Sequence, residues 1–144
     1  MKIKEIEVKN FRILEDICID LDRDVTYIVG RNNTGKTSLA EVFYKFFNTD
    51  TSKFRIEDFC LNCYKSLRAS ENLYQIYLKS IADKEPDEAV LDKEQGYKNS
   101  IPKIELSIKI EYEEEDNLAS LSAFIMDLDP SRKDIMISCE FSPK

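Results

Sequence analysis

The chain has 144 residues, of which 42% are hydrophobic and 34% charged, the composition of a globular domain large enough to bury a core. Its formal net charge of -7 makes it a poor general ligand for the phosphate backbone of nucleic acids, so we expect any such contact to lie outside these residues. No apolar stretch approaches the roughly 20 residues that cross a bilayer, and the charged start is unlike a signal peptide. We therefore expect a cytoplasmic protein without membrane association.

Three strands are predicted before the first glycine. Residues 2–8 alternate polar and apolar side chains, and residues 16–21 do the same after a bend at residues 9–12. Residues 25–29 form a nearly continuous β-branched and aromatic run, which is typical of a strand buried on both faces. This third strand leads directly into Gly30.

An amphipathic helix is predicted after the glycine-containing loop. Its apolar residues recur at helical spacing and form one stripe: Leu39, Val42, Phe43, Phe46 and Phe47. Residues 51–69 are expected to be extended and to pack through Phe54, Ile56 and Phe59 next to Asp58, and residues 71–82 have the pattern of a short helix.

The second half of the chain changes its periodicity. Residues 83–100 are polar and acidic, and we expect a solvated linker or mobile insertion there. Strict alternation over residues 103–112 and 135–141 predicts two strands that pair antiparallel, with a helix between them. The acidic run at residues 113–116 has two interpretations, a site for a metal or basic partner and a solvated loop before that helix; we favour the loop.

Four cysteines and no histidine limit the metal chemistry of the chain. Cys60 and Cys63 form a single Cys-x-x-Cys pair, and only the distant Cys18 and Cys139, in predicted strands, could complete a zinc site. We favour ordinary reduced cysteines over a zinc or redox site.

The sequence from Gly30 to Thr37 satisfies the phosphate-binding pattern G-x-x-x-x-G-K-[ST] at every fixed position. Gly30 permits a sharp exit from the strand, and Gly35 allows the backbone to approach phosphates closely. The amides of Asn33, Thr34, Gly35, Lys36, Thr37 and Ser38 are expected to form a nest at a helix N-terminus, where an anion is favoured. Lys36 would reach the β- and γ-phosphates of a nucleotide, and the Thr37 hydroxyl would take one position around Mg²⁺.

The first 60 residues resemble the N-terminus of ABC-type ATPase heads in the chromosome-maintenance and RecF group. They resemble most the overcoming-lysogenization-defect (OLD) family of ATP-dependent nucleases, which includes antiphage defence proteins. The matching residues are Ile6 to Arg12, Ile17 to Leu21, Gly30 to Ser38 with Asn32, and Phe54 with Glu57-Asp58-Phe59. Over residues 100–144 the resemblance is topological, since the antiparallel strands look like the β-subdomain of ABC ATPases.

The resemblance implies an α/β fold, the N-terminal lobe of a P-loop NTPase of ABC-ATPase type with an antiparallel β-subdomain. It implies ATP and Mg²⁺ as ligands, pairing of two heads around ATP, and DNA cleavage or repair by a longer parent protein. Gly30, Asn32, Asn33, Thr34, Gly35, Lys36, Thr37 and Ser38 would bind the nucleotide. Arg12 has two interpretations that we weigh equally, a contact to the nucleotide phosphates and a surface salt bridge.

Several parts of a complete ABC ATPase are missing from the sequence. There is no Walker B run, no Leu-Ser-Gly-Gly-type signature and no switch histidine, and Gln75 and Gln95 follow no convincing core strand. We therefore expect a fragment that binds nucleotide weakly and hydrolyses it poorly or not at all. Two alternatives stay open: a non-catalytic interaction module that binds nucleotide as a structural ligand, and a small P-loop kinase or GTPase.

Overall fold

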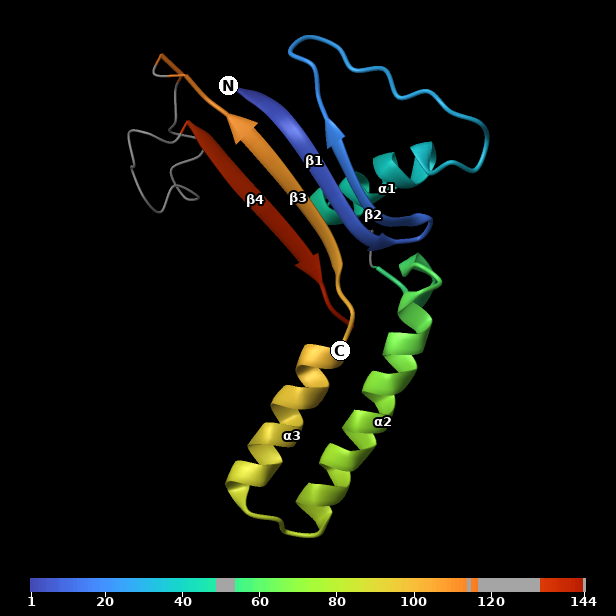
Figure 1. Ribbon diagram of the computed structural model, residues 1–144, viewed down its shortest axis with the longest axis vertical. Coiled ribbons are helices and arrows are strands. Elements are labelled where there is room, and N and C mark those ends of the chain that lie inside the picture. The colour runs from blue at the N-terminus through green and yellow to red at the C-terminus, as the bar shows by residue number, and fades with distance from the viewer. Residues whose placement is uncertain (49–53, 114, 117–132, 144) are drawn as a thin grey trace.

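A computed structural model of the chain describes residues 1–48, 54–113, 115–116 and 133–143, and Figure 1 shows its architecture. An antiparallel sheet carries one helix on a face, and a pair of helices extends away from the sheet. The elements in chain order are β1 (Lys2–Phe11), β2 (Leu14–Asp20), α1 (Lys36–Phe47), the short 3-10 helix η1 (Ile56–Asp58), α2 (Cys63–Ala82), α3 (Asp87–Ser100), β3 (Ile104–Glu111) and β4 (Asp134–Phe141).

The four strands form one sheet in the order β2-β1-β3-β4, with every neighbouring pair antiparallel. The predicted pairing of the last two strands is confirmed, since Leu106 lies opposite Cys139 and Ile108 opposite Ile137. β3 also pairs with β1, where Val8 lies opposite Leu106, so strands from the two ends of the chain meet in the middle of the sheet. Cys18 lies in edge strand β2, as predicted, and is exposed.

The hydrophobic core lies between the sheet and α1. The strands contribute the fully buried Val8, Ile104 and Leu106, and α1 contributes Val42 and Leu39. The alternation of β1 and β3 directs these apolar side chains to one face, and the helical stripe of α1 meets them there. This packing of the sheet against α1 therefore fixes the position of the first turn of α1 relative to the β1–β2 turn.

The segment after α1 is held by aromatic contacts. The ring of Phe54 lies 4.7 Å from Phe46 of α1 and 4.7 Å from Phe141 of β4, measured between centroids. Phe59 is buried and forms a bridge with Phe11 at the end of β1. The predicted aromatic packing is confirmed for Phe54 and Phe59 but is wrong for Ile56, which is exposed in η1.

The prediction of a solvated linker over residues 83–100 is wrong for α3, which packs antiparallel against α2 in a helical hairpin (Figure 1). Polar and aromatic contacts hold the two helices together. The Tyr74 and Tyr97 rings lie 5.1 Å apart, and the Ser100 hydroxyl donates a hydrogen bond of 2.9 Å to Ser70. Because these contacts use tyrosine and serine side chains, they leave no simple hydrophobic pattern in the sequence. The polar composition of α3 therefore resembles that of a linker. The predicted helix over residues 71–82 is present and begins earlier, at Cys63, so the prediction of an extended segment is wrong for residues 63–69.

The prediction of a buried strand over residues 25–29 is also wrong. The run has no regular secondary structure, and the side chains of Tyr27 and Val29 are 84% and 89% exposed. A central strand needs a neighbour on each side, and among the described residues every strand belongs to the antiparallel sheet. The run has the sequence of a buried strand, but the described residues supply no neighbouring strands that pair with it.

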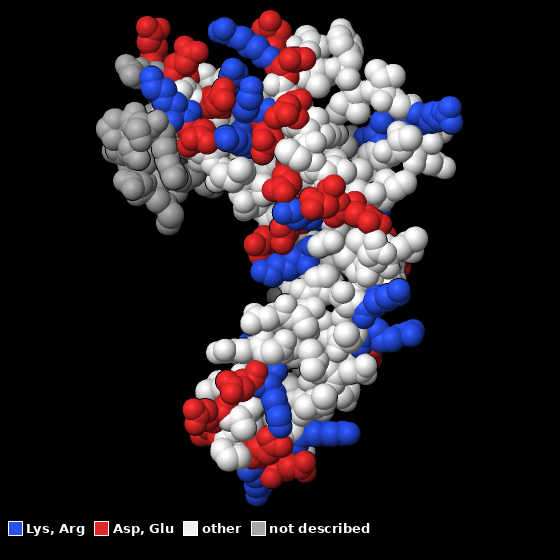
Figure 2. Space-filling model, viewed as in Figure 1, with Lys and Arg blue, Asp and Glu red and all other residues white. Residues whose placement is uncertain are grey.

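Charged side chains of both signs are mixed over the sheet and the hairpin (Figure 2). Ion pairs join neighbouring strands, for example Lys103 with Glu140 at 2.7 Å and Lys109 with Asp134 at 3.2 Å. No helix among the described residues is long and apolar enough to cross a membrane. The helix predicted between β3 and β4 lies outside the described residues.

Candidate nucleotide-binding site

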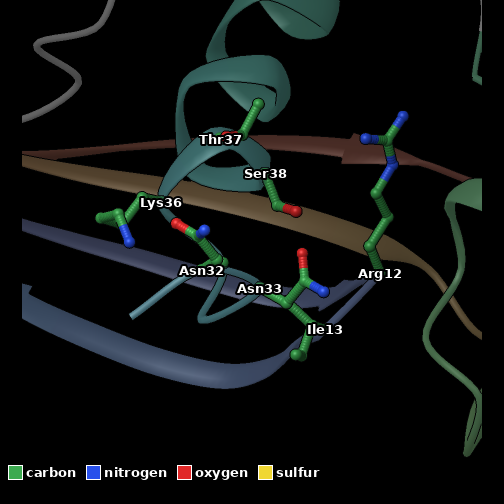
Figure 3. A pocket seen from close by; sticks show the side chains of 8 residues that line it. Arg12, Ile13, Asn32, Asn33, Lys36, Thr37 and Ser38 are labelled. Carbon is green, nitrogen blue, oxygen red and sulfur yellow. The ribbon is translucent and has the colours of Figure 1, made fainter. Parts of the chain in front are cut away.

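A pocket of about 510 Å³ lies where the β1–β2 turn meets the beginning of α1. Seven of the nine residues expected at a nucleotide site line it, together with Ile13 (Figure 3). The lining residues are Arg12, Ile13, Asn32, Asn33, Gly35, Lys36, Thr37 and Ser38. Its volume is within the roughly 300–1,000 Å³ typical of small-molecule sites.

Gly30 and Thr34, the other two expected residues, do not line this pocket. They border a second hollow of about 390 Å³ formed with apolar side chains of β2 and with Ile28 and Leu39. A Cβ atom on Gly30 would lie 2.6 Å from the Thr34 hydroxyl oxygen, so these residues pack against each other within the loop. Their position indicates a role in shaping the loop.

Gly35 forms the N-cap of α1 with φ 94°, a backbone conformation that favours glycine. The preceding Asn33 also has a positive φ of 64°, which asparagine tolerates better than most residues. No side chain caps the first turn of α1, and no acidic residue lies in it. The amides of Lys36, Thr37 and Ser38 therefore have no intrahelical acceptor and face a site suited to an anion.

The Lys36 ammonium folds over the loop. Its Nζ donates hydrogen bonds of 2.5 Å to the carbonyl oxygens of both Gly30 and Arg31, and it lies 3.5 Å from the Thr34 hydroxyl. These exposed contacts hold a compact cation across the loop, on the side of the pocket away from Arg12 (Figure 3). A phosphate anion is a stronger acceptor for an ammonium group than a peptide carbonyl is.

Arg12 lies in the β1–β2 turn with φ 51° and contacts two carboxylates. Its Nε and Nη2 donate to Oδ1 of Asp58 at 3.1 and 3.0 Å, and its Nη1 pairs with Glu41 of α1. The backbone amide of Arg12 also donates to the carbonyl oxygen of Asp58 at 2.8 Å. The structure therefore contains the salt bridge that is one of the two interpretations of Arg12. Arg12 also lines the pocket.

Asp58 is the buried centre of this cluster, with its side chain 5% exposed. Burial alone raises the pKa of Asp58, but hydrogen bonds from the Arg55 amide, Lys45 and Arg12 outweigh it and hold the pKa below its ordinary value. The sequence pattern places Asp58 next to the aromatic residues Phe54 and Phe59 and indicates no partner for it. Its contact with Arg12 joins residues 46 positions apart, for which the local sequence carries no signal.

Cys60 and Cys63 follow Asp58 in the chain and lie together. Both are buried free thiols, with their sulfur atoms 3.0 Å apart. Burial raises the pKa of Cys63 to about 12, so its thiol stays protonated. Among the described residues there is no group of three or more histidine, cysteine, aspartate or glutamate side chains that could hold a metal ion.

The family of the chain follows from comparison of its sequence with known proteins. The model of the AAA ATPase domain family matches residues 1–143. The chain belongs to this family. As an AAA ATPase domain it is a P-loop NTPase, and the described residues form a partial α/β unit in which the phosphate-binding loop precedes α1.

Two curated relatives of this AAA ATPase domain match over a short stretch. Both are the DNA replication and repair protein RecF of Lactococcus lactis subsp. cremoris, from strains MG1363 and SK11, and each is 41% identical over 44 residues. The match covers 31% of the chain and 12% of the length of each relative. No solved structure matches the chain.

Proposed function

We propose that this AAA ATPase domain binds ATP with Mg²⁺ in the pocket between the β1–β2 turn and α1. One observation carries the proposal: the uncapped first turn of α1 and the Lys36 ammonium converge on one loop that lines this pocket. Loops with these features bind phosphate groups through backbone amides and a lysine. The matching family is one of ATPases, which supports ATP as the nucleotide.

Different residues of the loop contact different parts of the polyphosphate. The amides from Asn33 to Ser38 surround the phosphate oxygens, and Lys36 exchanges its carbonyl contacts for the β- and γ-phosphates. Gly35 lets the loop pack against the β1–β2 turn, because a Cβ atom there would collide with Leu14 and Ile13. Asn32 borders the same pocket from the loop, and Arg12 supplies a second cation at its far side.

Thr37 is the residue that would hold Mg²⁺. It lies in the first turn of α1 and borders the pocket, and its hydroxyl oxygen is a hard donor suited to this ion. Mg²⁺ bound there would neutralise phosphate charge, and Thr37 would hold it from the first turn of α1.

For the longer protein we propose ATP-dependent processing of DNA by paired heads. The relatives that support this are named for DNA replication and repair, and the chain spans only 12% of their length. The resemblance of the first 60 residues to OLD-type nucleases favours DNA cleavage and a role in antiphage defence. Detection of a Walker B acid and a nuclease domain in a longer reading frame, followed by a DNA cleavage assay, tests this part.

Calorimetric titration of the chain with Mg-ATP tests the binding proposal directly. Lys36→Ala should abolish measurable binding, whereas Lys65→Ala, which removes an exposed lysine of α2, should leave it unchanged. Competition with Mg-GTP distinguishes an ATPase from a GTPase. Absence of binding by a folded wild-type chain would contradict the proposal and favour the alternative of a docking module.

A further inference from the structure

The guanidinium of Arg12 is held by two carboxylates in very different surroundings. The Asp58 side chain is 5% exposed, whereas the Glu41 side chain is 40% exposed. Asp58 contacts the edge formed by Nε and Nη2, and Glu41 contacts Nη1. The two sides of one guanidinium therefore have separate partners.

The contact with Asp58 is fixed. Besides Arg12, the Asp58 carboxylate accepts a hydrogen bond of 2.9 Å from the Arg55 amide and lies 2.9 Å from Lys45 Nζ. The backbone amide of Arg12 donates to the Asp58 carbonyl, and the neighbouring Phe11 bridges to Phe59. Removing any one of these donors from the buried carboxylate costs free energy, because the charge then loses a hydrogen bond that water cannot replace.

The contact with Glu41 is exchangeable. Glu41 follows Thr37 by one turn of α1, so it stands directly behind the loop that lines the pocket. Both members of the pair are more than a third exposed, and exposed ion pairs contribute little because water solvates the separated charges well. Arg12 lines the pocket, and the exposed Glu41 side chain can swing away from Nη1 while Nε and Nη2 stay on Asp58.

We infer that Glu41 competes with the phosphate groups of the nucleotide for Nη1 of Arg12, while Asp58 holds the guanidinium in place. This inference rests on the proposed binding of ATP and assigns two positioning residues to that site. Asp58 sets where Arg12 stands. Glu41 weakens nucleotide binding, because its pair with Arg12 must break before Nη1 can reach a phosphate.

Titration of the full 144-residue chain with Mg-ATP tests the competition. Glu41→Gln keeps the shape of the side chain and removes its charge, and it should tighten binding by up to about fivefold. Glu57→Gln is the matched control, because it removes an exposed carboxylate of η1 next to Asp58 and should leave the affinity unchanged. A Glu41→Gln chain that binds no more tightly than wild type overturns the inference.

The Arg12→Gln background separates competition from simple repulsion between Glu41 and the phosphates. If Glu41 acts through Arg12, adding Glu41→Gln to Arg12→Gln should not change the affinity. The same gain in both backgrounds would show repulsion alone and overturn the inference.

Loss of binding in Lys36→Ala, with no effect at Glu41, would leave the proposed function standing and remove only the competition. A folded wild-type chain that binds no Mg-ATP removes both.

Discussion

Gly35 lies so close to Leu14 that no side chain fits between them. A Cβ atom on Gly35 would be 2.5 Å from Cδ2 of Leu14 and 3.1 Å from Cγ2 of Ile13. Leu14 is a buried core residue at the start of β2, so it cannot easily move aside. The β1–β2 hairpin therefore determines how the phosphate-binding loop is shaped and restricts this position to glycine.

Gly35→Ala should destabilise the chain and abolish Mg-ATP binding. The φ of 94° and the collision with Leu14 together predict a loss of at least about 2 kcal/mol in the free energy of unfolding. Urea denaturation and calorimetry measure the two effects. Gly96→Ala in α3 is the control, since nothing lies within 4 Å of its added Cβ, and it should be neutral or stabilise the helix by up to about 1 kcal/mol. Equal effects at the two glycines would contradict the role of Leu14.

Asp58→Asn should lower the free energy of unfolding at neutral pH by roughly 3 kcal/mol, because Arg12 and Lys45 lose a buried partner. The pKa of Asp58 is lower in the folded chain than its ordinary value of 3.8. Its stabilising contribution is therefore complete above pH 3.8 and disappears as the pH falls through the lower folded value.

The difference in stability between the wild type and Asp58→Asn should narrow accordingly when urea denaturation is repeated below pH 3.8. A difference that stays constant from neutral to acid pH would show that the charge of Asp58 is unimportant.

Cys63 should resist alkylation in the folded chain. Its thiol is buried, and burial raises its pKa from 9.0 to about 12, so little thiolate forms at pH 8. Cys18 is exposed on β2 and should react with iodoacetamide much faster. Mass spectrometry after timed labelling distinguishes the two sites, and denaturant should remove the difference. Equally fast labelling of both thiols in the folded chain would contradict the burial of Cys63.

Val29→Ser should change the free energy of unfolding of this chain by less than about 0.5 kcal/mol, because the Val29 side chain is 89% exposed. A valine buried in a strand would instead cost about 1–3 kcal/mol when replaced in this way. Urea denaturation of the two proteins decides between these values. Val42→Ser, at a fully buried position of α1, is the control and should show the larger loss. A large loss at Val29 would restore the prediction of a buried strand.

The local sequence predicts those parts of the fold that depend on neighbouring residues. The spacing of Gly30, Gly35 and Lys36 indicates a phosphate-binding loop, and seven of the nine predicted site residues line one pocket. Helix α1 and strands β3 and β4 follow from their periodicity, because one face of each must be apolar to reach the core. Even the antiparallel pairing of β3 with β4 is correctly predicted.

Only the tertiary structure determines which distant groups meet. A run such as residues 25–29 has the composition of a buried strand, but a strand exists only where neighbours supply its hydrogen bonds. The hairpin of α2 and α3 depends on contacts such as Tyr74 with Tyr97, which no periodicity reveals. Arg12 contacts Asp58 because the packing of the core places the β1–β2 turn against η1. The sequence by itself determined the motif of the Gly30–Thr37 loop, whereas the packing of distant segments decided which carboxylates hold the arginine beside it.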